Sequence, residues 1–99
     1  MKIQRKPNDA WAYYNRAVVL RECGDNFGAI ADLNQVRKIN SNDANAYYQR
    51  GRLHEREENT QQAIVDLKKA ADIYQGKGDT YGYEYTLDEI KRIEQQSSP

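Results

Sequence analysis

The sequence predicts an all-α fold made of two helical hairpins and a final helix. Two observations support this prediction. The chain repeats itself without a gap at an interval of 34 residues, and the apolar and small residues within each unit recur at helical spacing. A fixed period of this length is typical of repeat proteins whose units stack on one another.

The internal repeat joins residues 8–41 to residues 42–75. It contains twelve identical pairs, which fall mainly at the start and in the second half of each unit. The pairs are Asn8/Asn42, Asp9/Asp43, Ala10/Ala44, Ala12/Ala46, Tyr13/Tyr47, Tyr14/Tyr48, Arg16/Arg50, Ala29/Ala63, Ile30/Ile64, Asp32/Asp66, Leu33/Leu67 and Ile39/Ile73.

Each unit is predicted to form two helices that each bury one stripe of residues. A spacing of three or four residues places side chains on one helical face. Between the two stripes lie residues 24–26 and 58–60, where Gly, Asp, Asn and Thr favour a turn and the start of a new helix. The stripes are Tyr13, Ala17 and Leu20, then Ala29, Leu33 and Val36 in the first unit, and Tyr47, Gly51 and His54, then Ala63, Leu67, Ala70 and Tyr74 in the second.

This pattern resembles the tetratricopeptide repeat (TPR) family, in the spelling common in bacterial tandem-repeat proteins. The resemblance implies a short right-handed α-solenoid of two TPR helical hairpins plus a C-terminal capping helix, in a single domain over residues 1–99. Five positions depart from the family pattern, and two of them, Ser41 and Gln75, replace the usual proline between repeats. Arg16 and Arg50 stand where Leu is common, and His54 stands where an apolar residue is usual. Because Gln75 replaces the usual proline, we expect the second helix of the second repeat to run about a turn longer.

A capping helix is expected over about residues 79–95. Its apolar stripe is predicted to be Tyr83, Leu87, Ile90 and Ile93, and its exposed face Glu84, Asp88, Lys91 and Arg92. The opening Gly-Asp-Thr-Tyr-Gly equally echoes residues 24–28, so the register of this helix within the repeat stays open. Residues 7–10 resemble a turn between repeats, which suggests a longer parent array.

The composition argues against several classes of function. Fifteen basic and fifteen acidic residues leave no net charge to attract nucleic acid, and no apolar run approaches the ~20 residues that span a membrane. One Cys and one His cannot complete a zinc site, and Cys23 and His54 stand at non-equivalent repeat positions. We therefore expect no nucleic-acid or membrane partner, no metal or other cofactor and no enzymatic activity. The lone Cys23 is compatible with a cytoplasmic protein.

The TPR resemblance implies a concave groove lined by the first helix of each repeat. Groove side chains should lie about 100° around these helices from the core stripe. There Tyr offers apolar area with a hydroxyl, amides can bond a peptide backbone, and Arg can bind a carboxylate through two hydrogen bonds. The predicted groove residues are Tyr14, Asn15, Val18, Arg21, Tyr48, Gln49, Arg52 and Glu55. Alternatively, Tyr14 and Tyr48 pack against the preceding helix and the charges are merely solvated.

Two functions are consistent with these observations. The first is a scaffold that binds a peptide or protein partner in the groove. The second is a structural module that forms a homo-oligomer through uncovered ends of the solenoid, and Trp11 near the start of the first repeat favours contact of this kind. Analytical ultracentrifugation distinguishes them, since a strict monomer excludes the second.

Overall fold

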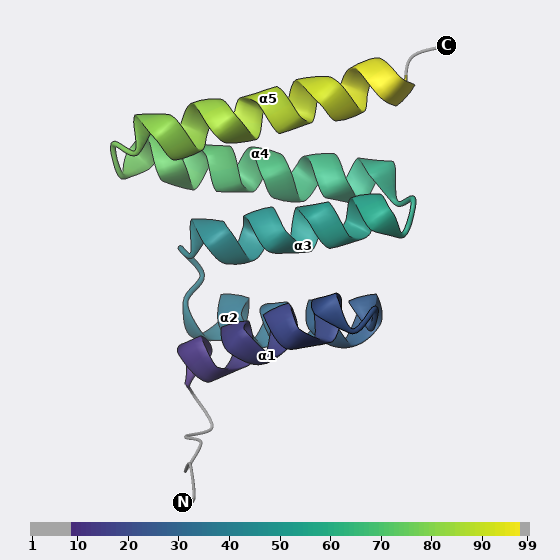
Figure 1. Cartoon of the computed structure of the whole chain (residues 1–99). Helices are drawn as coiled ribbons and strands as arrows, with labels where there is room; N and C mark the ends of the chain where they lie inside the picture. The colour runs from purple at the N-terminus through teal and green to yellow at the C-terminus, as the bar shows by residue number, and fades with distance from the viewer. Residues whose placement is uncertain (1–8, 98–99) are drawn as a thin grey trace, which may run out of the picture.

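The computed structural model describes residues 9–97 and confirms the predicted all-α architecture. Within this range the chain forms five helices (Figure 1). They are α1 (Ala10–Glu22), α2 (Asn26–Ile39), α3 (Ala44–Arg56), α4 (Thr60–Gly76) and α5 (Thr80–Ser97). None of the helices in residues 9–97 combines the length and apolar character that crossing a lipid bilayer requires.

The helices form an α-solenoid in which successive helices run antiparallel. α1 lies in front of α2, and the stack continues upward through α3 and α4 to α5, so that α1 and α5 lie at opposite ends (Figure 1). The closest packing joins α1 to α2, α3 to α4, and α4 to α5. Pro7 and Asn8, which belong to the proposed inter-repeat turn, lie outside the described residues.

Short polar residues stand at the starts of the helices. The carboxylates of Asp9 and Asp43 accept hydrogen bonds from the backbone N–H groups of Ala12 and Ala46, which are equivalent pairs in the two repeats. Such caps satisfy backbone donors that the first turn of a helix leaves unpaired. Gly24 turns the chain between α1 and α2 with a φ of +87°, a conformation that glycine adopts without strain.

The core follows the predicted stripes. Ala17, Ala29, Leu33 and Val36 are buried together, and the equivalent stripe of α4 is buried in the same way. At Gly51 a Cβ atom would lie 3.0 Å from the Leu67 side chain, so the absence of a side chain lets α3 approach α4 closely.

Leu53 is a core residue that the sequence stripe misses. It is 1% exposed and packs with Ala17, Leu33 and Ala46, so it joins the second hairpin to the first. The predicted stripe instead ends on His54, which is only partly buried.

The last two helices differ in detail from the expectation. α4 ends at Gly76, three residues beyond the position equivalent to the end of α2, as the missing proline predicts. α5 continues to Ser97 rather than ending near residue 95. Its first turn copies that of α2, because Gly78 has a φ of +75° and the Asp79 carboxylate accepts from the N–H of Gly82, as Asp25 does from Gly28.

One residue of the predicted exposed face of α5 is only partly exposed. Ile90 and Ile93 are buried as predicted, but Arg92 does not stand on a fully exposed face. Its guanidinium group lies between Glu89 of its own helix and Glu55 of α3. Helical periodicity places Arg92 beside the core stripe, and only the packing of α5 against α3 shows that a carboxylate lies there.

Candidate peptide-binding face

One face of the solenoid is formed by α1, α3 and α5, which run parallel to one another (Figure 1). Side chains rather than backbone bridge these helices. Arg21 of α1 donates a hydrogen bond to Gln49 of α3, and the ring of Tyr48 on α3 stacks at an angle against that of Tyr85 on α5. We call this surface the α1–α3–α5 face.

The first hollow on this face lies between the N-terminal halves of α1 and α3. It encloses about 430 Å³. Trp11, 75% exposed, and Tyr14, half-buried, supply its aromatic surface. Its lining residues are Ala10, Trp11, Tyr14, Asn15, Asp43 and Asn45.

A second hollow of about 360 Å³ lies toward the C-terminal ends of α1 and α3 and reaches α5. We call it the arginine hollow, because three guanidinium groups border it. Its lining residues are Arg21, Glu22, Tyr48, Gln49, Arg52, Leu53, Arg56 and Tyr85.

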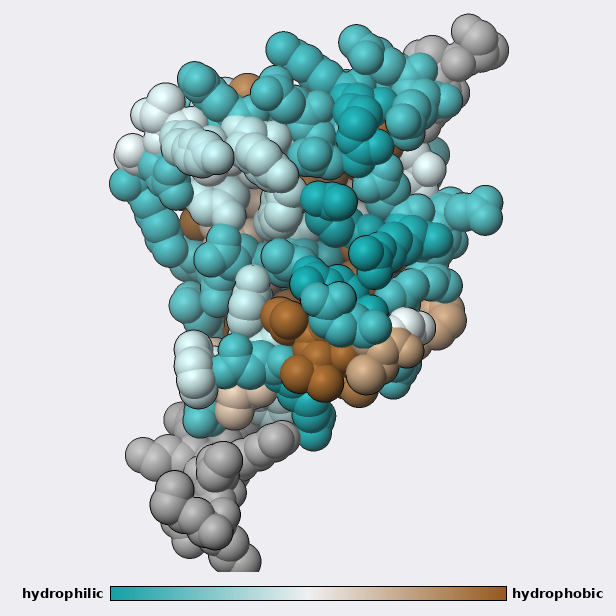
Figure 2. All heavy atoms as spheres, in the orientation of Figure 1, coloured by the Kyte–Doolittle hydropathy of each residue, from teal (hydrophilic) through white to brown (hydrophobic). Residues whose placement is uncertain are grey.

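A third hollow of about 360 Å³ lies between α3 and the first half of α5, beside the end of α4. Tyrosines dominate it, and Tyr81 and Tyr85 of α5 have ring centroids 6.3 Å apart. Figure 2 shows pale atoms of intermediate hydropathy over this part of α5, and brown hydrophobic atoms over α1. The lining residues are Asn45, Tyr48, Gln49, Tyr74, Tyr81, Gly82, Tyr85 and Thr86.

Most of the predicted groove residues border these hollows. Tyr14 and Asn15 line the first hollow, Arg21 and Arg52 line the second, and Tyr48 and Gln49 line both the second and the third. Two predicted residues lie elsewhere. Val18 borders a small cleft of about 10 Å³ between α1 and α3, and Glu55 is paired with Arg92.

Sequence reasoning missed the contribution of α5. That helix was expected only to cover the end of the core, yet Tyr81 and Tyr85 line the tyrosine-rich hollow and are 73% and 50% exposed. Two large aromatic side chains outside the predicted apolar stripe of the helix were the available signal, because exposed aromatic residues are enriched at binding surfaces.

The sequence left open whether Tyr14 and Tyr48 face a groove or pack against the preceding helix. Both pack partly against the core and also border hollows. Burial raises the pKa of Tyr14 above its usual value, and a hydrogen bond with Gln49 opposes the shift. Burial, and then a hydrogen bond with Tyr85, raise the pKa of Tyr48 to about 12, so its hydroxyl stays protonated at neutral pH.

Arg52 holds the Tyr48 ring in place on the α1–α3–α5 face. Its Nη1 donates to the Tyr48 hydroxyl at 3.1 Å, and its guanidinium carbon lies 5.9 Å from the centre of that ring. The Arg52 side chain is 41% exposed, so the same group remains accessible from solvent. Because Arg52 and Tyr85 both contact the Tyr48 ring before a ligand arrives, the ring loses little conformational freedom on binding.

Away from this face, Arg50 and Asp66 form a buried ion pair with two hydrogen bonds of 2.7 and 2.6 Å. A third donor of Arg50 reaches Asn34 of the first hairpin at 2.8 Å. Arg50 and Asp66 both belong to identical pairs of the repeat, but their ion pair was not predicted from the sequence. His54 Nε2 lies 3.6 Å from Asp66, and burial lowers the pKa of His54 despite that carboxylate.

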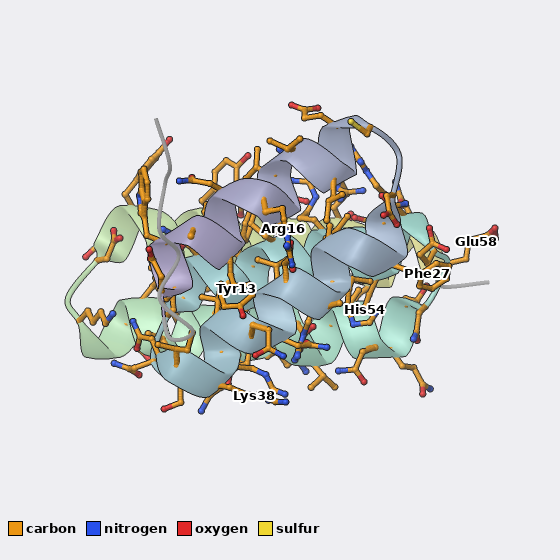
Figure 3. The ribbon with its side chains drawn as sticks, turned by 90° about the horizontal axis from the view of Figure 1, so that it is seen from below. Tyr13, Arg16, Phe27, Lys38, His54 and Glu58 are labelled. Carbon is orange, nitrogen blue, oxygen red and sulfur yellow. The ribbon has the colours of Figure 1, made fainter. Side chains whose placement is uncertain are left out.

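The equivalent pair in the first hairpin is Arg16 with Asp32, again with bonds of 2.7 and 2.6 Å. Figure 3, which views the molecule from below, shows Arg16 between α1 and α2 at this end of the stack. The Arg16 side chain is 47% exposed, whereas that of Arg50 is 11% exposed. The arginine–aspartate pair therefore occurs in both repeats. In the second repeat it is buried because the first hairpin packs against it.

No cluster of three His, Cys, Asp or Glu side chains that could hold a metal ion occurs in residues 9–97. Cys23 is exposed at the end of α1. Neither observation adds a catalytic group to the α1–α3–α5 face.

Comparisons with known proteins agree with this architecture. Two models of the tetratricopeptide repeat match residues 3–31 and residues 44–77. No curated protein matches the sequence. The solution NMR structure of a tetratricopeptide repeat domain protein from Salinibacter ruber matches 96% of both chains with a TM-score of 0.86 at 19% sequence identity, a similarity of fold. The chain belongs to the tetratricopeptide repeat family.

Proposed function

We propose that this protein is an interaction scaffold that binds an extended peptide segment of a partner along the α1–α3–α5 face. Tetratricopeptide repeats generally mediate protein–protein interactions, and the family is generally non-catalytic. The main support for binding at this face is its row of hollows, in which tyrosine, amide and arginine groups converge from three helices.

The chemistry of this surface suits a peptide. Tyr48 and Tyr85 offer flat apolar area with a polar edge, a combination that is frequent in the residues that dominate binding energy. Gln49 and Asn45 supply both a donor and an acceptor, which an extended peptide backbone needs. Since the arginine hollow and the tyrosine-rich hollow share Tyr48, Gln49 and Tyr85, one ligand can occupy both.

Replacing Tyr48 or Arg52 by alanine is expected to weaken peptide binding by about tenfold or more, because both side chains line the arginine hollow. The ligand for this measurement is a dodecapeptide selected from a random phage-displayed library with the wild-type protein as bait. Isothermal titration calorimetry gives the affinities, and far-UV circular dichroism checks that helicity is unchanged.

Matched controls lie outside the α1–α3–α5 face. Phe27, 72% exposed, and Lys38 lie on α2 and point away from α1 (Figure 3). Phe27→Ala and Lys38→Gln should leave the affinity unchanged. Unchanged affinity in both Tyr48→Ala and Arg52→Ala would contradict the assignment of this face.

Self-association is a second candidate, and one comparison within the molecule favours it. Val19 is 58% exposed, whereas the equivalent Leu53 is 1% exposed beneath the first hairpin. At the α1 end of the stack, Val19 is therefore an exposed apolar side chain, whereas the first hairpin covers the equivalent Leu53 of the second repeat. If this end joins two copies, sedimentation equilibrium will show a dimer that Val19→Asp dissociates, and a monomer at the highest attainable concentration would exclude it.

A further inference from the structure

The arginine hollow has a local excess of positive charge in a chain whose net charge is zero. Three arginines and one glutamate line it. The glutamate, Glu22, points largely into solvent with a side chain that is 74% exposed, and it lies 3.9 Å from Arg21. Solvent screens such a long, exposed contact, so it neutralises little of the charge in the hollow.

Two further carboxylates beside Arg52, those of Glu55 and Glu89, are already bound to a different arginine. Arg92 lies 3.1 Å from Glu55 and 2.7 Å from Glu89. The corresponding distances from the Nε of Arg52 are 3.9 and 4.0 Å, which is too long for a hydrogen bond. Arg52 therefore stands near two carboxylates without being hydrogen-bonded to either.

Arg21 and Arg56 also retain donors. The Nη1 group of Arg21 bonds to a neutral amide, that of Gln49, which leaves the positive charge without a bonded counter-charge. Arg56 is exposed at the last turn of α3, and no carboxylate of the described segment lies within salt-bridge distance of it. The three guanidinium groups thus border one hollow with hydrogen-bonding capacity to spare.

Apolar surface adjoins this charge. The rings of Tyr48 and Tyr85 line the same hollow, with centroids 5.9 Å apart and planes inclined by 53°. A ligand group that binds the arginines must therefore belong to a chain whose neighbouring atoms can lie on two aromatic rings. A peptide side chain meets that requirement, because its own backbone and adjacent residues extend over the tyrosines.

We propose that the partner segment carries an acidic residue, Asp or Glu, whose carboxylate binds in the arginine hollow while the adjoining residues lie on Tyr48 and Tyr85. A carboxylate is the planar acceptor that a guanidinium group matches through two parallel hydrogen bonds. A Lys or Arg of the ligand would instead face three like charges. This inference rests on the proposed function and specifies the chemistry of its ligand.

The test uses paired dodecapeptide pools and ¹⁵N NMR of the full chain. Each pool has one fixed central residue, Glu or Gln, and an equal mixture of Ala, Ser, Gly, Leu and Tyr at the other positions. We expect the Glu pool to bind about fivefold more tightly than the Gln pool, an advantage typical of a partly exposed ion pair and reduced by added salt. The resonances of residues around the arginine hollow should shift with either pool.

Two variants test whether the preference for the Glu pool arises in the arginine hollow. The double variant Arg21→Gln, Arg52→Gln should bind both pools equally, whereas Lys38→Gln should retain the full preference for Glu. Equal binding of both pools by the wild-type protein, with shifts on the α1–α3–α5 face, would overturn the acidic-ligand inference and leave the proposed function standing. An absence of shifts with either pool would overturn both, and a preference that persists in the double variant would place the acidic site elsewhere.

Discussion

Replacing Arg50 by alanine is expected to lower the free energy of unfolding by about 3 kcal/mol, a cost typical of removing one partner of a buried ion pair. The change leaves the Asp66 carboxylate, which is 1% exposed, without its two hydrogen bonds. It also removes the bond from Arg50 to Asn34 that joins the second hairpin to the first. Urea denaturation followed by circular dichroism measures the loss.

The repeat supplies its own control in Arg16→Ala. That arginine makes the same two bonds to Asp32, but half of its side chain is exposed at the end of the stack. Water can replace the lost bonds there, so a clearly smaller loss is expected. Arg50→Lys should fall between wild type and Arg50→Ala, because an ammonium group keeps the charge but not the paired geometry. Equal losses for the two alanine variants would contradict the role of burial.

The second large effect is expected at Leu53. Truncation to alanine should lower the free energy of unfolding by roughly 2–4 kcal/mol, because it removes a 1% exposed side chain from the interface between the hairpins and leaves a cavity. The matched variant is Val19→Ala at the equivalent position of the first repeat. Since Val19 is 58% exposed, we expect a change below about 0.5 kcal/mol.

The pair of variants is measured by thermal and urea unfolding under the same conditions. If both hairpins unfold together, Leu53→Ala will shift a single transition. Two separate transitions in that variant would show instead that Leu53 couples hairpins which are otherwise independent, as expected for stacked repeats with a weakened interface. A loss at Val19 as large as that at Leu53 would contradict the observed burial.

The repeat and its helices could be predicted because their signals are local. The spacing of Ala29, Leu33 and Val36 identifies a helical face, and Asp25 lies where a helix start is expected. The longer α4 was predicted for the same reason, since a missing proline acts on its own segment of chain. Leu53 was missed because its burial comes from the first hairpin and not from the predicted stripe of its own helix.

The candidate site was predicted only in part. Tyr14, Tyr48 and Arg52 lie on the predicted surface because the position of a side chain around a helix follows from its number. The pairing of Glu55 with Arg92, and the place of Tyr85 beside Tyr48, could not be foreseen. The two residues of each pair are 37 positions apart, three more than the repeat interval, because α4 is three residues longer than α2.

By itself the sequence determined that this protein is a stack of helical hairpins. The same helical pattern of apolar residues occurs in both repeats, so the two hairpins have matching apolar faces that are buried against each other. Only the tertiary structure decided which copy of each repeated residue is buried. Arg16 and Arg50, or Val19 and Leu53, occupy the same positions in the repeat yet differ in exposure. The physical reason is that burial depends on a neighbouring hairpin. The first hairpin covers Arg50 and Leu53, and within residues 9–97 no other hairpin covers Arg16 and Val19 in the same way.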